Sequence, residues 1–252
     1  MKKPLWSFIV LLLSGLLPAF LPAAPLGGRF MLSLHPGLGF FSMDDLNRAL
    51  AVRHSVLLPL PTTPSVPSMS WGLDLGTGLQ YGICDYLLAG LDLSYLTTDT
   101  SVKLGAGAPF PPQDQYYILR VPALELSGVV RAAWPVNHLL VLSAGAGWSF
   151  ISLTNASEAM ESRGTLTGTV YSSQGIPFRG QGWGMKAMAG VEFWVWEWFS
   201  LGLEAGYRWA KIESILAKDL QGAEITPQTP GGSDLSIDYS GPFVRYQFNF
   251  YF

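Results

Sequence analysis

The sequence predicts an all-β protein, an eight-stranded antiparallel up-and-down transmembrane β-barrel with short periplasmic turns and long extracellular loops. Three observations support this fold class. Hydrophobic residues make up 49% of the 252 residues and charged residues only 13%, which is about half the charged share of a typical soluble protein. Apolar side chains recur at every second residue, which is the period of a β-strand. The segments with this period are joined alternately by short and by long connections, as in bacterial outer-membrane barrels.

The first 24 residues are predicted to be a cleaved signal peptide. Lys2 and Lys3 precede an apolar run, and Ala23 and Ala24 supply a small-residue cleavage site. Cleavage after Ala23 is favoured over cleavage after Ala24, and an uncleaved membrane anchor is the alternative. Residues 25–252 then form a single barrel domain with 13 basic and 18 acidic residues, a net charge of −5. This balance predicts no nucleic-acid partner.

The first four strands are predicted at 29–41, 69–82, 86–97 and 115–133. In the second strand, the odd positions from Trp71 to Tyr81 are mostly apolar, whereas the even positions are glycine or polar. In the fourth strand the apolar parity slips from odd to even. A bulge at 121–123 restores it, because Pro122 lacks the N–H donor that a strand pair needs. Pro36 predicts a similar break in the first strand. The long connections are 42–68 and 98–114, and the short one is 83–85.

The last four strands are predicted at 139–152, 181–195, 199–212 and 234–252, with short turns at 134–138 and 196–198 and long loops at 153–180 and 213–233. Apolar residues take alternate positions in each, and Pro242 predicts a break in the last. Residues 132–157 carry no charged side chain, so a transmembrane helix is the alternative there. Pro135, Asn137 and His138 interrupt that run, which favours two strands around a turn.

The end of the chain carries an independent signal. The apolar residues Val244, Tyr246, Phe248, Phe250 and Phe252 alternate with other residues up to the last position. This pattern resembles the C-terminal signature by which the assembly machinery recognises outer-membrane barrel proteins. The resemblance implies that Tyr246, Phe248, Phe250 and Phe252 form the assembly signal. The expected partners are the barrel assembly machinery, periplasmic chaperones and outer-membrane lipids, and the expected location is the bacterial outer membrane.

Aromatic residues are predicted to form two girdles at the membrane boundaries. Trp71 and Tyr81 lie ten residues apart on one strand, which at roughly 3.3 Å per residue and a tilt near 40° spans about 25 Å, the height of a lipid-facing band. The periplasmic girdle comprises Tyr81, Tyr86, Trp134, Trp196 and Trp198. The outer girdle comprises Trp71, Tyr95, Tyr117, Trp148, Trp183, Tyr207 and Trp209.

Ten charged residues are predicted to face the inside of the barrel. They are Asp74, Asp92, Arg120, Glu125, Arg131, Lys186, Glu192, Glu204, Arg208 and Arg245. A charge on the lipid face costs roughly 2–4 kcal/mol near the midplane, whereas paired charges fill a closed lumen. Counting from the periplasmic turns predicts a Glu204–Arg245 contact, with Glu192 and Arg131 in a lower layer and Lys186 and Arg208 above.

The first long connection, 42–68, carries two further patterns. Residues 43–50 predict a short helix with acidic residues in its first turn. Residues 56–67 contain four prolines among Val, Leu and Thr, which predicts an extended apolar segment. This segment either contacts a ligand or partner, or packs over the mouth of the barrel.

The whole mature chain resembles the small eight-stranded outer-membrane proteins, namely the barrel domain of OmpA, OmpX and Ail, and the OmpW group. No motif decides between these branches. The resemblance implies a non-enzymatic surface protein, in which a rigid barrel displays loops for adhesion, for other surface interactions with an extracellular partner or for membrane integrity. The alternative is an OmpW-like narrow channel or carrier for small hydrophobic molecules. A charge-filled lumen argues against a carrier, and an apolar upper lumen argues for one.

A lipid-modifying enzyme is the third hypothesis for the function. Barrel enzymes that deacylate lipid A carry a His-x-Ser pair, and none of His35, His54 and His138 begins one. Ser33 and His35 share one strand face, but they point inward and show no acidic partner in the sequence. Cys84 is the only cysteine, so neither a disulfide within the chain nor a cysteine metal site is expected. We expect no catalytic residues, no metal and no cofactor.

Overall fold

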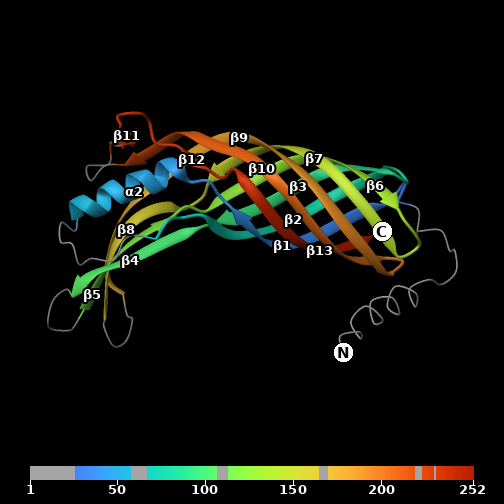
Figure 1. Cartoon of the computed structure of the whole chain (residues 1–252), viewed down its shortest axis with the longest axis horizontal. Coiled ribbons are helices and arrows are strands. Elements are labelled where there is room, and N and C mark those ends of the chain that lie inside the picture. Colours follow the sequence, from blue (N-terminus) through green and yellow to red (C-terminus); the bar gives the residue numbers. More distant parts are fainter. Residues whose placement is uncertain (1–25, 58–66, 107–112, 165–169, 219–222, 230) are drawn as a thin grey trace, which may run out of the picture.

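A computed structural model gives the fold of residues 26–57, 67–106, 113–164, 170–218, 223–229 and 231–252 (Figure 1). The predicted signal peptide and most of the apolar segment predicted at 56–67 lie outside these residues. Antiparallel strands make up most of the described chain, which confirms the all-β prediction. Within the described ranges, no helix has the length and apolar character needed to span a membrane.

Eight strands form a closed antiparallel ring. Each pairs with the next in the order β13, β1, β2, β3, β6, β7, β9, β10, and β10 pairs with β13 to close the ring. The strands are β1 Phe30–Phe40, β2 Trp71–Cys84, β3 Leu87–Thr97, β6 Ala123–Pro135, β7 Leu140–Leu153, β9 Val170–Trp196, β10 Phe199–Lys218 and β13 Gly241–Tyr251. The predicted eight-stranded up-and-down barrel is confirmed.

The outer face of the barrel is apolar, as a lipid-facing surface requires. On β2, five outward side chains are each more than 40% exposed: Trp71, Leu73, Leu75, Leu79 and Tyr81. Asp74 and Gln80 lie between them in sequence and are buried on the inside. Exposed large apolar side chains recur in this alternation on all eight ring strands. Such a band marks a membrane-spanning barrel.

The predicted aromatic girdles lie on this outer face, with one exception. Trp148 and Trp183, near the long-loop end, are 64% and 66% exposed, and Trp134 and Trp196, near the turns, are also exposed. The assignment of Tyr117 to the outer girdle is wrong, because its side chain is buried. Tyr117 lies on a strand outside the barrel. The apolar side of that strand faces a protein core instead of lipid.

The sheet continues beyond the barrel at the long-loop end (Figure 1). The strands β4 Asp99–Ala106, β5 Gln113–Arg120 and β8 Ala156–Gly164 pair in that order, and β8 pairs with the first part of β9. The upper part of β10 pairs with β9 and with the short strands β11 Glu224–Ile225 and β12 Ile237–Asp238. Connections that were predicted as long loops therefore form, in large part, a folded extension above the membrane.

Two predicted strand irregularities are wrong. The segment 115–133 contains no bulge but two strands, because the chain passes from the extension to the barrel at Val121 and Pro122, which lie between β5 and β6. In β1, the register with both neighbours is constant through Pro36. The break expected at Pro242 lies just before it, where Gly241 has a φ of 152°. A Cβ at Gly241 would lie 1.8 Å from the carbonyl oxygen of Phe40, so only glycine fits there.

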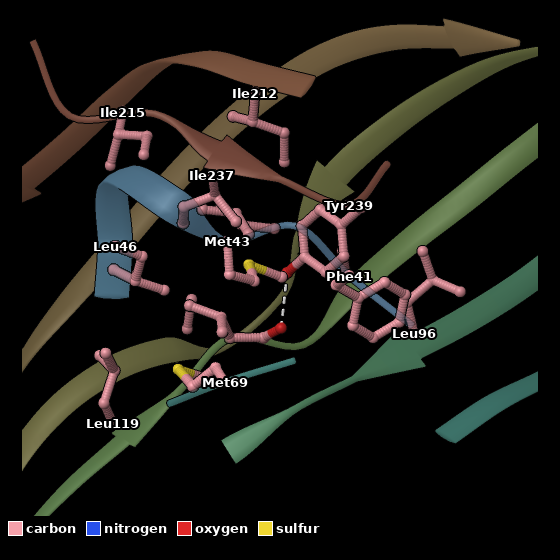
Figure 2. Packing of buried hydrophobic residues seen from close by; sticks show 14 of the residues in the cluster. Phe41, Met43, Leu46, Met69, Leu96, Leu119, Ile212, Ile215, Ile237 and Tyr239 are labelled. Atoms are coloured by element: carbon pink, nitrogen blue, oxygen red, sulfur yellow. Dashed lines mark hydrogen bonds between the residues drawn. The ribbon is translucent and has the colours of Figure 1, made fainter. Parts of the chain in front are cut away.

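A large apolar core fills the mouth between the barrel and the extension (Figure 2). The predicted helix at 43–50 is confirmed as α2, Asp44–Leu57, which is longer than expected. Leu46 and Leu50 of α2 pack into this core. The Asn47 side chain donates to the Met69 carbonyl at 2.9 Å and accepts from the Met69 N–H at 2.8 Å. These two bonds fix α2 to the start of β2, so the helix closes the mouth.

The core also joins the two places where the chain passes between the barrel and the extension. The Tyr239 hydroxyl donates to the Val121 carbonyl at 2.5 Å (Figure 2). Burial raises the pKa of Tyr239 well above its usual value, so the phenol keeps its proton. This bond ties the β12–β13 junction to the β5–β6 junction.

Candidate functional site

The lumen of the barrel is the candidate site, because the structure gathers nine of the ten predicted charges there. None of the nine is more than 6% exposed: Asp74, Asp92, Glu125, Arg131, Lys186, Glu192, Glu204, Arg208 and Arg245. They come from six strands, and each stands at a position whose neighbours in sequence face outward. Their burial shows that side chains, not a water-filled passage, occupy the middle of the barrel.

The placement of Arg120 in the lumen is wrong. It ends β5, in the extension, and its side chain is 53% exposed and 3.9 Å from the Glu161 carboxylate. The odd residues of β5, Tyr117 and Leu119, face the apolar core. The apolar side of β5 therefore points inward, and Arg120 lies on the opposite side.

The upper part of the network surrounds Arg208. Its Nη2 donates to Asp74 Oδ2 at 2.7 Å, and its Nε donates to Glu125 Oε2 at 2.9 Å. Arg245 Nη2 reaches the same Asp74 oxygen at 3.0 Å. Because buried carboxylates need partners to remain charged, these two arginines stabilise acids that come from three different strands.

The middle part of the network centres on Asp92. Its Oδ2 accepts from Lys186 Nζ at 2.6 Å and lies 3.4 Å from Arg245 Nη1. Its Oδ1 lies 2.6 Å from His35 Nε2. The sequence alone did not give His35 an acidic partner, and the β1–β2–β3 register supplies one two strands away.

The predicted Glu204–Arg245 contact is present, but it is not the shortest contact of either residue. The two are cross-strand partners, with Arg245 Nη1 3.9 Å from Glu204 Oε1. Glu204 Oε2 accepts from Arg131, and also from Gln247 Nε2 at 2.9 Å. Arg131 therefore pairs with Glu204, and it makes no contact with Glu192, which was predicted to share its layer.

Glu192 is instead held by uncharged groups. Ser200 and Tyr251 both donate their hydroxyl protons to Glu192 Oε1. Asn249 Nδ2 donates to Ser200 Oγ at 3.2 Å. The sequence analysis did not single out these polar partners, although Asn249 and Tyr251 occupy the positions between the residues of the predicted assembly signal.

Apolar groups close both ends of the lumen. At the periplasmic end, Trp194 stacks on Tyr251 with ring centroids 4.4 Å apart. Leu26, Met31, Leu88, Ala133 and Val141 complete this cluster. At the other end lies the core that contains α2. The charges therefore lie between two apolar layers.

The lumen does not hold the geometry of a hydrolase. Ser33, His35 and Asp92 lie close together, but Ser33 Oγ bonds to the Gly78 carbonyl at 3.4 Å and His35 Nδ1 has no partner in the described chain. All three are buried, so a substrate has no access to them. No group of three or more His, Cys, Asp or Glu side chains suited to a metal ion occurs in the described ranges.

The sequence matches no protein-family model, and no curated protein matches it in sequence. Solved structures resemble it in fold. The outer membrane protein OprG from Pseudomonas aeruginosa aligns with a TM-score of 0.48 and 9% identity, over 90% of this chain and 96% of that one. Neisserial surface protein A gives 0.43 and 12%, over 89% and 97%. Ail, the attachment invasion locus protein of Yersinia pestis, gives 0.35 and 11%, over 90% and 100%.

Proposed function

We propose that this protein is a non-enzymatic outer-membrane barrel with a closed, charge-filled lumen, and that it acts through the surface it displays. The observation that carries the proposal is the burial of the lumen charges. Nine charged side chains with at most 6% exposure lie between two apolar layers. A barrel filled in this way serves as a rigid anchor in the membrane.

The folded extension supports a role at the cell surface. β4, β5 and β8 lengthen the sheet beyond the membrane, and a core of twenty described residues stabilises them. Building such a core costs chain entropy, which a simple turn between strands avoids. The extension therefore presents its outer face in a fixed arrangement. We propose that an extracellular partner binds there, in adhesion or in maintaining the membrane surface.

Planar-bilayer recording tests the closed lumen. The refolded full-length protein should give no regular unitary openings, because the network and both apolar layers block the passage. A variant in which Arg120 is replaced by leucine should be equally silent, since Arg120 lies outside the lumen. Reproducible openings with solute selectivity in the wild-type protein would contradict the closed lumen.

One observation favours a second candidate, a carrier for small hydrophobic molecules. The mouth of the barrel is apolar and contains Met43 and Met69, whose flexible side chains adapt to irregular ligands. Met43 has a φ of 47° directly before α2, a strained conformation for a residue other than glycine. Displacement of α2 would open this core to an apolar ligand.

The probe N-phenylnaphthylamine separates the two candidates. If the mouth is only a structural core, the probe should not bind saturably to the protein refolded in lipid vesicles, once the signal of protein-free vesicles is subtracted. Replacing Leu46 with tryptophan fills the core further. Saturable binding that this substitution abolishes would establish the carrier and overturn the display-only function.

A further inference from the structure

Glu192 is a buried carboxylate that lacks a basic partner. Its side chain accepts hydrogen bonds from Ser200 and Tyr251, and it forms no ion pair with any described residue. Each of the other four lumen carboxylates contacts an arginine or a lysine. A buried charge with only neutral hydrogen-bond donors remains uncompensated.

The charge balance of the lumen points to the same residue. Five carboxylates face four arginine and lysine side chains in the lumen, so one carboxylate is left without an arginine or lysine of its own. Arg131 is engaged by Glu204 and Gln247. His35 lies against Asp92, so it supplies no partner for Glu192. The carboxylate without an arginine or lysine partner is therefore Glu192, near the periplasmic end of the lumen.

A second polar group in the same place lacks a partner. The Asn249 side chain is fully buried, and its Oδ1 receives no hydrogen bond from any described residue. Its Nδ2 donates to Ser200 Oγ, which in turn donates to Glu192. A single hydroxyl group thus connects the unpartnered amide to the uncompensated carboxylate. The Asn249 oxygen lacks a donor and the Glu192 carboxylate lacks a base, and a cation satisfies both.

We propose that Glu192 and Asn249 bind a monovalent metal cation, sodium or potassium, in the lower lumen. The oxygen groups around this point are one carboxylate, one amide and two hydroxyls, and such hard ligands suit these ions. A single carboxylate matches a single positive charge. A calcium ion prefers six to eight oxygens, often from several carboxylates, whereas this point offers only one carboxylate. The proposal concerns a structural ion and is independent of the proposed surface function.

The test measures the stability of the refolded full-length protein at constant ionic strength in chloride salts of potassium, sodium or N-methylglucamine. A ligand at ten times its dissociation constant raises the folded-to-unfolded ratio about elevenfold. We expect a saturable rise of this kind with potassium or sodium. N-methylglucamine is too large for the site and should give none.

Variants assign the effect to the site. Glu192→Gln should lose the dependence on small cations, and Asn249→Leu should weaken it. Glu213→Gln is the matched control, because it also removes one carboxylate but from a side chain that is 75% exposed, and it should retain the full dependence. Equal stability of the wild-type protein in all three salts would overturn the proposal, as would a dependence that persists in Glu192→Gln.

Diffraction keeps the proposal testable if the variants fail to refold. Crystals of the wild-type protein soaked in rubidium or thallium should show an anomalous peak within coordination distance of the Glu192 carboxylate. No peak there at full exchange would overturn the proposal.

Discussion

Single side chains in the lumen stabilise the barrel because each has several partners. Arg245 contacts Asp74 at 3.0 Å, Asp92 at 3.4 Å and Glu204 at 3.9 Å. Its guanidinium also lies over the ring of Phe243, 4.6 Å from the centroid. Removing such a residue leaves several buried acids with fewer partners. The loss in the free energy of unfolding therefore exceeds the contribution of any single contact.

We predict that Arg245→Leu lowers the free energy of unfolding by about 3–5 kcal/mol, because it leaves buried carboxylates uncompensated. Arg120→Leu is the control, and its exposed ion pair should change stability by no more than about 0.5 kcal/mol. Urea titration of both proteins in lipid vesicles measures the difference. Equal midpoints would show that the lumen charges do not stabilise the barrel.

Glycine positions give a second test at this scale. A Cβ on Gly37 would lie 2.3 Å from the Val244 carbonyl oxygen, whereas a Cβ on Gly128 would meet nothing within 4 Å. Gly37→Ala should therefore destabilise the barrel by about 1–3 kcal/mol, and Gly128→Ala should be neutral or slightly stabilising. The same urea titrations compare them, and a larger loss for Gly128→Ala would contradict the described packing.

The sequence predicted the side to which charges point better than it predicted their partners. The strand period places Glu204 and Arg245 on the inside of the barrel. Counting residues from the periplasmic turns gives their heights along the barrel axis. Arg131 is closer to Glu204, but it comes from β6, which is not adjacent to β10. Long side chains cross the lumen, so their partners depend on how all eight strands are staggered, and no single strand reveals this.

The strands themselves were predictable where lipid surrounds them. A lipid-facing strand needs an apolar residue at every second position, which gives the alternation seen in β2 and β10. β8 has the sequence Ala-Ser-Glu-Ala-Met-Glu-Ser-Arg-Gly, and it lies in the extension, outside the membrane. It lacks an apolar alternation, so the sequence predicts a loop there, and only the pairing with β5 and β9 identifies the strand.

The junction between barrel and extension should depend on Tyr239. Tyr239→Phe leaves the buried Val121 carbonyl without its donor, so we predict a loss of about 1–3 kcal/mol. Tyr86→Phe is the control, because Tyr86 is 60% exposed. We expect Tyr239→Phe to accelerate hydrogen exchange, relative to the wild-type protein, more in β4, β5 and β8 than in the barrel strands. Mass spectrometry measures this exchange. Exchange that accelerates uniformly in all strands would contradict a local role.

For the whole molecule, we predict that deletion of Phe252 lowers the amount of folded barrel in cells several-fold. Phe252 is exposed at the end of β13, and its backbone exchanges two hydrogen bonds with Phe30. The proposed assembly signal would lose its terminal aromatic residue. Heat-dependent migration on gels measures the folded fraction, and Phe252→Tyr, which keeps the ring, should retain it.

Folding of the purified chains into lipid vesicles separates recognition from stability. If Phe252 serves recognition, the deleted chain should fold in vesicles nearly as well as the wild-type chain. Deleted protein that reaches the wild-type level in cells would contradict the proposed assembly signal.

The position of Arg245 on the last strand has a consequence for incomplete chains. The β2–β3 hairpin brings two buried acids, Asp74 and Asp92, and no base. Arg245 reaches both of them past β1, where Gly37 leaves room for it. Lys186 of β9 and Arg208 of β10 supply one base to each acid, and Arg245 of the last strand is the only base that contacts both. A chain that lacks the last strand leaves each acid with one basic partner fewer, so the charges that stabilise the complete barrel disfavour an incomplete one.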